Sequence, residues 1–164
     1  MNVTIIQDSR EKNPLILQAY PIEVTGLPVG DYGIKGFSDW ENPQFIVERK
    51  SLNDLIGSLT RDRARFEKEV LKMRQFQFRA LLIEAEEVQI EIGDYRSAAK
   101  PNAILQSLAS FQVRHNIHII FGGSHNSAAR VLERLVRQFV RGIEKDMHRL
   151  SKAEKEAGEV GSAT

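Results

Sequence analysis

The sequence predicts an α/β fold in which a mixed central β-sheet is flanked by helices on both faces. Apolar or β-branched runs of strand length occur at residues 3–7, 21–25, 32–36, 45–47, 80–83 and 117–121. From residue 51 onward, segments with helical periodicity alternate with these runs. Strands that first follow one another and then alternate with helices are typical of a mixed sheet that is covered on both sides.

Turn-forming residues separate the first strands. The β-branched run at 3–7 ends at Asp8, where polar residues begin. The second run is followed by four residues that favour tight turns, namely Gly26, Pro28, Gly30 and Gly33. These residues bracket the start of the third strand. Residues 37–43 then predict a hairpin loop that leads into the fourth.

The fourth strand leads into a charged triplet. Residues 45–47 are apolar and too few for a helix, and Glu48-Arg49-Lys50 follows them directly. Ser51 and Asp54 have the spacing of a capping box, which predicts that a helix begins at Ser51. A second helical stretch is expected at about 64–76.

The second half of the chain alternates between the two kinds of element. Residues 80–83 predict a buried strand, 87–100 show no regular pattern, and Pro101 begins a helix. A late strand at 117–121 precedes the last helix, which we expect at about 127–150. Residues 151–164 are small and charged, and we expect them to form a flexible tail.

The last helix has the clearest periodicity in the sequence. Its apolar stripe consists of Val131, Leu132, Leu135, Val136, Phe139, Val140, Ile143 and Met147. The opposite side carries Arg130, Arg134, Arg137, Arg141 and Lys145. This basic side is either a solvated helix face or a DNA contact. The apolar stripe is long enough to suggest the hypothesis of a homodimer.

Length and composition restrict the class of protein. The 164 residues suit one domain, which we expect at 1–150. Because there is no cysteine, any metal must be held by oxygen or imidazole ligands. The first residues have no basic flank and no long apolar run, and nowhere do 18 apolar residues follow one another. We therefore expect an intracellular protein of the cytoplasm, nucleoid or nucleus, neither secreted nor membrane-bound.

Asp31, Glu48 and Lys50 are the strongest candidates for a catalytic site. Asp31 lies in a turn and Glu48 at the end of a buried strand, where a rigid element fixes a carboxylate that solvent still reaches. Hydrolysis of a phosphodiester needs neutralised charge and an activated water, and Mg²⁺ bound by one or two carboxylates supplies both. Residues two apart in a strand share a face, so Lys50 is expected beside Glu48. Lys50 then orients or deprotonates the water, or stabilises the transition state.

Three ordered motifs carry a family resemblance. The segment 48–54 (Glu-Arg-Lys-Ser-Leu-Asn-Asp) resembles the Glu-Arg-Lys-x-x-x-Asp signature of the XPF family of structure-specific endonucleases. Gly30-Asp31-Tyr32 resembles the family's Gly-Asp element, and the segment 8–11 (Asp-Ser-Arg-Glu) resembles its Asp-x-Arg-Glu start. The similarity extends over about residues 1–145.

The resemblance implies a restriction-endonuclease-like fold, dependence on Mg²⁺ or Mn²⁺, and cleavage of DNA near branches, flaps or forks. It implies that Asp31, Glu48 and the backbone carbonyl of Arg49 hold the metal, with Lys50 as the catalytic lysine. The supporting catalytic residues that it implies are Asp8, Arg10, Glu11, Arg49 and Asp54. Members of the family usually add a tandem helix-hairpin-helix domain or a helicase, so we expect a partner or a homodimer to supply targeting here.

Several of these residues have a simpler interpretation. The simpler interpretation of Asp54 is a helix cap alone, and that of Asp8 is a turn at the end of a strand. For Arg10 and Glu11 it is a surface ion pair. Arg49 should point away from its two neighbours and serve packing or a salt bridge. The cluster Arg61, Arg63 and Arg65 is the best candidate for contact with DNA phosphates.

Two other functions remain open from the sequence. A catalytically inactive DNA-binding or scaffold subunit would be free to lose Asp31, Glu48 and Lys50, which are all present. A junction resolvase or restriction-type nuclease of the same fold is the second alternative. The order Glu48-Arg49-Lys50 with Asp54 following favours the XPF-like interpretation.

Overall fold

The computed structural model describes residues 1–162, which are built around one six-stranded sheet. The strand order is β2-β1-β3-β4-β5-β6. The strands are β1 (Ile5–Asp8), β2 (Ile22–Thr25), β3 (Tyr32–Ile34), β4 (Phe45–Ser51), β5 (Phe78–Glu84) and β6 (His118–Phe121). β3 is antiparallel to both of its neighbours, whereas all other pairs are parallel. The predicted mixed sheet is confirmed.

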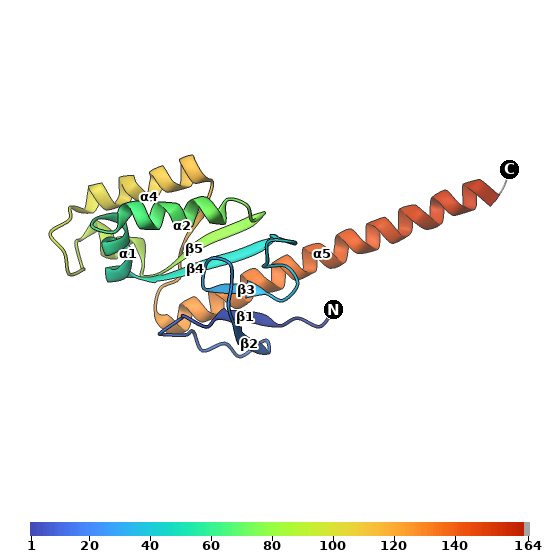
Figure 1. The fold of residues 1–164 in the computed structure, drawn as a ribbon, viewed down its shortest axis with the longest axis horizontal. Helices are drawn as coiled ribbons and strands as arrows, with labels where there is room; N and C mark the ends of the chain where they lie inside the picture. The colour runs from blue at the N-terminus through green and yellow to red at the C-terminus, as the bar shows by residue number, and fades with distance from the viewer. Residues whose placement is uncertain (163–164) are drawn as a thin grey trace.

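Helices cover both faces of the sheet (Figure 1). They are α1 (Leu52–Leu59), α2 (Arg63–Met73), α3 (Glu87–Glu91), α4 (Pro101–His115) and α5 (His125–Ser162). One hydrophobic cluster joins the sheet to α1, α2 and α4 through residues such as Leu55, Phe66 and Phe111. A second cluster joins the other face to α5 through Leu132 and Val136. The α/β class with helices on both faces is therefore confirmed.

β4 is longer than the sequence indicated. It continues through Glu48, Arg49 and Lys50 to Ser51, because all seven of its residues pair with β5. The charged triplet thus lies inside a central strand and not after its end. Ser51 caps α1, and its hydroxyl oxygen accepts a hydrogen bond from the backbone N–H of Asp54 at 3.2 Å. The predicted helix start is confirmed.

Two expectations about helices are wrong. Residues 87–100 were expected to be irregular but contain the short helix α3, where Glu86 N donates to the side chain of Gln89. The last helix does not end near Leu150, since α5 continues to Ser162 and projects from the body (Figure 1). Alanine, glutamate and lysine are frequent after Leu150, and these residues favour a helix even without a packing surface. The flexibility expected for 151–164 stays a prediction, and its last two residues lie outside the described part.

Among the described helices, none combines the length and the apolar character that a membrane span requires.

Candidate active site

Asp31 lies beside β4 because two hydrogen bonds with the backbone of β4 hold it there. Its own N–H donates to Val47 O at 2.9 Å, and its carboxylate accepts from the N–H of Arg49 at 2.8 Å. Asp31 therefore extends the β3–β4 pairing with its side chain. In a strand the N–H and C=O of one residue point to the same side. The carbonyl of Arg49 is accordingly directed toward the edge on which Asp31 lies.

Gly30 makes this approach possible. Its φ is +76°, and a Cβ atom built there would lie 2.7 Å from Cγ1 of Ile46 in β4. A side chain would thus meet both backbone strain and a steric clash. Glycine lets the turn pass close to β4 and deliver Asp31 to its position.

Glu48 and Lys50 lie on the same side of β4. Lys50 Nζ is 3.2 Å from Oε1 of Glu48, and it also lies 5.1 Å from the centre of the Phe66 ring. The alternation of side chains along the strand predicted this placement, which is confirmed. Phe66 belongs to α2, so this helix holds the lysine side chain against the strand.

Asp31 and Glu48 open into one cleft with a volume of about 270 Å³. Its walls are formed by Asp8, Arg10, Pro28, Val29, Gly30, Asp31, Glu48, Glu69 and Lys72. Burial raises the pKa of Asp31 to about 6. Burial and the negative charge of Asp31 raise the pKa of Glu48 to about 8. Both shifts mean that the two carboxylates lack enough positive charge around them when they are ionised.

This donor set fits a hard divalent cation. Within residues 1–162, no group of three or more histidine or acidic side chains is arranged to hold a metal ion. Of the acids that line the cleft, Asp31 and Glu48 are the two whose carboxylates have raised pKa values. Mg²⁺ commonly takes one or two carboxylates and completes its shell with water and phosphate oxygens. A cation between the two groups would also supply the positive charge that their raised pKa values show to be lacking.

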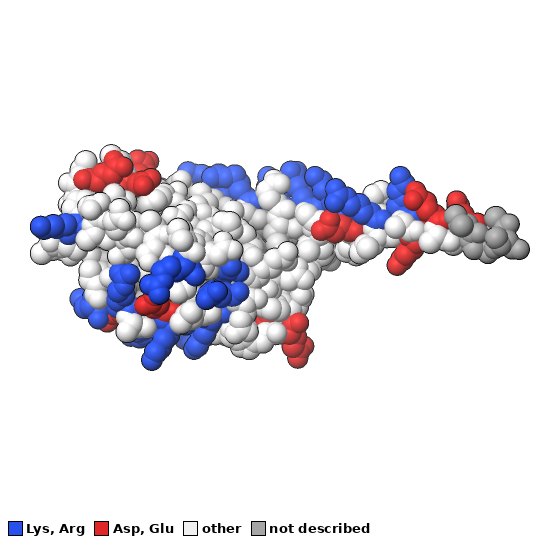
Figure 2. Space-filling view, turned by 90° about the horizontal axis from the view of Figure 1, so that it is seen from above, with Lys and Arg blue, Asp and Glu red and all other residues white. Residues whose placement is uncertain are grey.

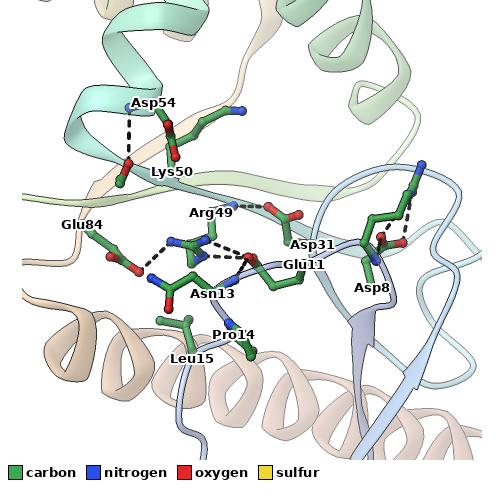
Figure 3. A network of polar contacts seen from close by, with 12 residues as sticks. Asp8, Glu11, Asn13, Pro14, Leu15, Asp31, Arg49, Lys50, Asp54 and Glu84 are labelled. Carbon is green, nitrogen blue, oxygen red and sulfur yellow. Dashed lines mark hydrogen bonds and ion pairs between the residues drawn. The ribbon is translucent and has the colours of Figure 1, made fainter.

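Arg49 points to the other side of β4 and holds a buried ion-pair network (Figure 3). Its guanidinium donates to both carboxylate oxygens of Glu11 at 2.7 and 2.9 Å and to Glu84 at 2.9 Å. Burial alone would raise the pKa of Glu11, but its bonds with Arg49 lower it overall. His125 at the start of α5 contacts Glu84 at 2.7 Å. The network therefore ties the strand of the triplet to β5 and α5.

Asp8 and Arg10 form a separate pair at the rim of the cleft. The buried Asp8 carboxylate accepts from the backbone N–H and the guanidinium of Arg10, at 2.7–3.0 Å, and from Leu27 N at 2.8 Å. These bonds outweigh the effect of burial and lower the pKa of Asp8 overall. Asp8 thus fixes the turn after β2, and the side chain of Arg10 is 71% exposed at the cleft.

The remaining candidates differ in their surroundings. The backbone of Asp54 completes the cap of α1, and its side chain is exposed. Arg61 and Arg65 are exposed and pair with Asp62, at 3.4 and 3.8 Å. Arg63 instead donates to Ser107 of α4 at 2.8 Å and lies over the Phe111 ring. The three arginines therefore do not form one surface, since Arg61 and Arg65 are exposed whereas Arg63 packs against α4. Their contact with DNA phosphates stays a prediction.

Four residues of the site were not among the sequence candidates. Glu69 and Lys72 line the cleft from α2, and Glu84 and His125 complete the network around Arg49. Glu84 could have been noticed as the acid that ends the apolar run at 80–83. Glu69 and Lys72 gave no such signal, because their role depends on how α2 lies on the sheet.

The ERCC4 domain family model matches residues 7–135, a range that contains all three motifs. The chain belongs to the ERCC4 domain family. This ERCC4 domain has the fold of XPF from Aeropyrum pernix, with a TM-score of 0.64 and 21% identity over 82% of this chain and 65% of that chain. The same protein in complex with DNA matches with a TM-score of 0.64 and 21% identity over 85% and 66% of the two chains.

The chain therefore spans slightly less than two thirds of the XPF chains that it resembles. No curated protein sequence matches it. The resemblance to the XPF family that the motifs predicted is confirmed by the family match and by the shared fold.

Proposed function

We propose that this ERCC4 domain is a metal-dependent DNA endonuclease that hydrolyses phosphodiester bonds at branched DNA such as flaps and forks. One observation carries the proposal: Asp31 and Glu48 share a cleft, and Lys50 reaches Glu48 at 3.2 Å. The family is one of nucleases, and a DNA complex is known for the XPF protein with the same fold. A binding module has no need of two buried carboxylates with raised pKa values.

Asp31, Glu48 and the carbonyl of Arg49 would hold Mg²⁺ or Mn²⁺. When bound there, the ion would neutralise charge on the scissile phosphate and make water nucleophilic at neutral pH. The protein contributes a rigid arrangement. Asp31 is fixed by Arg49 N, and Glu48 is fixed in the middle of a paired strand. Such preorganisation reduces the rearrangement that the reaction requires.

Lys50 acts as a hydrogen-bond donor in this proposal. Its ammonium is already paired with a carboxylate, so the lysine is better suited to stabilise negative charge than to accept a proton from water. It would support the extra negative charge of the pentavalent phosphate in the transition state. Arg10 and Lys72 at the walls of the cleft would hold the neighbouring phosphates.

The proposal is tested by cleavage of a panel of labelled DNAs. Flap, fork, four-way junction, linear duplex and single-stranded DNA are each incubated with the protein in Mg²⁺, Mn²⁺ or chelator. We expect cuts near the branch with either metal and none with chelator. Glu48→Gln and Lys50→Ala should lower the rate at least about a hundredfold, whereas Glu91→Gln, an exposed acid at the end of α3, should not.

Each alternative function predicts a different result in this cleavage assay. Tight binding of forked DNA without cuts in any metal would identify a scaffold subunit and contradict the nuclease. Equal cutting of all five substrates would remove the preference for branches and leave the nuclease activity. Cuts confined to symmetric positions in the four-way junction would favour a resolvase.

A further inference from the structure

The outer side of α5 carries an uninterrupted row of cations. Its members are Arg130, Arg134, Arg137, Arg141 and Lys145, all of them exposed. At 3.6 residues per turn they fall within a wedge of about 80° and extend for about 22 Å along the helix. We call this row the α5 stripe. Figure 2 shows Lys and Arg along one edge of the projecting helix, apart from a second basic group on the body.

The acids of α5 that flank the stripe are engaged elsewhere. Glu133 accepts the backbone N–H groups of Gln18 and Ala19 at 2.5 and 2.7 Å. Glu144 pairs with the N-terminal ammonium at 3.4 Å. Among the residues that the structure describes, none of the five cations of the stripe forms an ion pair. A helix face that is merely solvated usually mixes both signs at i,i+4 spacing, as Lys152 and Glu156 do further along.

The stripe faces away from the catalytic cleft. The apolar side of α5 packs on the sheet through Leu132 and Val136, so the opposite side points outward from the face that α1, α2 and α4 do not cover. The cleft is lined by Glu69 and Lys72 of α2, which belongs to the other layer. A DNA segment bound to the stripe must therefore differ from the DNA strand that the proposed function places in the cleft.

We infer that the α5 stripe binds the backbone of a duplex arm of DNA, separate from the strand that is cut. The inference rests on the proposed function for the identity of the polyanion. The length of the stripe corresponds to about six base pairs of duplex at 3.4 Å each. Five unpaired arginine and lysine side chains in one line complement the phosphates of a duplex and read no bases. Two separated contact surfaces on one chain would favour DNA with more than one arm.

Binding of a fluorescent fork in chelator tests the inference without any cleavage. The stripe variant combines Arg134→Gln, Arg137→Gln and Arg141→Gln. The matched control removes the same charge from exposed positions outside α5 through Arg96→Gln, Lys100→Gln and Arg114→Gln. Anisotropy is measured over a series of salt concentrations, and the unfolding temperatures of both variants are compared with the wild type to confirm folding.

We expect the stripe variant to bind the fork at least about tenfold more weakly and to lose about two to three units of slope in log Kd against log salt. The control should keep the slope of the wild type. Equal behaviour of the two variants would overturn the inference. Equal binding of polyglutamate and DNA to the stripe would assign it to acidic polypeptides and also overturn it. Because chelator prevents hydrolysis, a failure here does not depend on whether the protein cuts DNA.

Discussion

At the scale of single residues, the candidate site opposes folding of the protein without metal. Asp31 and Glu48 are both acidic, both at least partly buried, and their pKa values are raised to about 6 and about 8. The unfolded chain ionises these groups near pH 4. Between pH 4 and pH 8 the folded state therefore binds more protons than the unfolded state, so stability without metal falls as pH rises.

Glu48→Gln is accordingly expected to stabilise the protein while it abolishes cleavage. At pH 8 the substitution removes a buried carboxyl that is about half ionised and whose charge Lys50 only partly balances. The unfolding temperature should therefore rise by several degrees, at about 2–4 °C per kcal/mol. At pH 5, where Glu48 is protonated, the difference should nearly vanish. Calorimetry in chelator at both pH values measures the two differences. A lower unfolding temperature of the variant at pH 8 would contradict the shifted pKa.

Arg49 is expected to be structural, in contrast to its two neighbours. The side chains of Arg49 and Glu11 are only 8% and 4% exposed, and removal of the arginine takes from the buried acids Glu11 and Glu84 the guanidinium that they share. Arg49→Met should destabilise the protein by about 3–5 kcal/mol. Arg61→Met, at a side chain that is 81% exposed, should change stability by less than about 0.5 kcal/mol. Urea unfolding measures the free energy of unfolding of both variants. Equally small decreases in the two variants would show that the network adds no stability.

At the scale of elements, the turn before β3 decides where Asp31 lies. Gly30→Ala introduces a Cβ atom 2.7 Å from the side chain of Ile46, at a φ of +76°. We expect it to cost about 2 kcal/mol of stability and to weaken Mn²⁺ binding at least about tenfold, since Asp31 must move. Gly26→Ala in the same loop has nothing within 4 Å and serves as the control. Titration calorimetry with Mn²⁺ compares the variants, and equal affinities would show that the turn does not place the ligand.

The end of α5 is expected to contribute little to the stability of the body. The side chains of residues 151–159 are exposed, and the apolar cluster on this face ends at Val140. A chain that stops after Leu150 should keep the unfolding temperature of the full chain to within about 2 °C, a change that corresponds to less than about 1 kcal/mol. A larger decrease would mean that these turns pack on something, such as a second copy of the chain.

The sequence predicted those elements that depend on local pattern. Strands, the cap at Ser51 and the side shared by Glu48 and Lys50 follow from alternation and spacing, and the structure has them. The contacts that combine separate segments could not be predicted in this way. Arg63 contacts α4, and Glu69 and Lys72 line the cleft. These positions depend on how α2 packs on the sheet, which the spacing of residues in the sequence does not determine. The sequence underestimates the length of α5 because the residues after Leu150 have high helical propensity but no apolar stripe to mark them as a helix.

At the scale of the whole molecule, a net charge of +1 hides a strong separation of charge. Four acids, Asp8, Asp31, Glu48 and Glu69, line the cleft together with two cations, whereas the α5 stripe carries five unpaired cations on the opposite layer. In the proposed function, the cleft would hold the divalent ion and the strand that is cut, and the stripe would hold a separate duplex arm. If the proposed function holds, this separation would let a nearly neutral protein attract DNA to the stripe and hold a divalent ion in the cleft.

The position of a bound metal ion tests the central claim most directly. Crystals soaked in Mn²⁺ and measured at its absorption edge would locate the ion by anomalous scattering. The account predicts a single strong peak between the carboxylates of Asp31 and Glu48, next to the carbonyl of Arg49, and its loss in Glu48→Gln. A peak at any other place, with none between these two side chains, would contradict it.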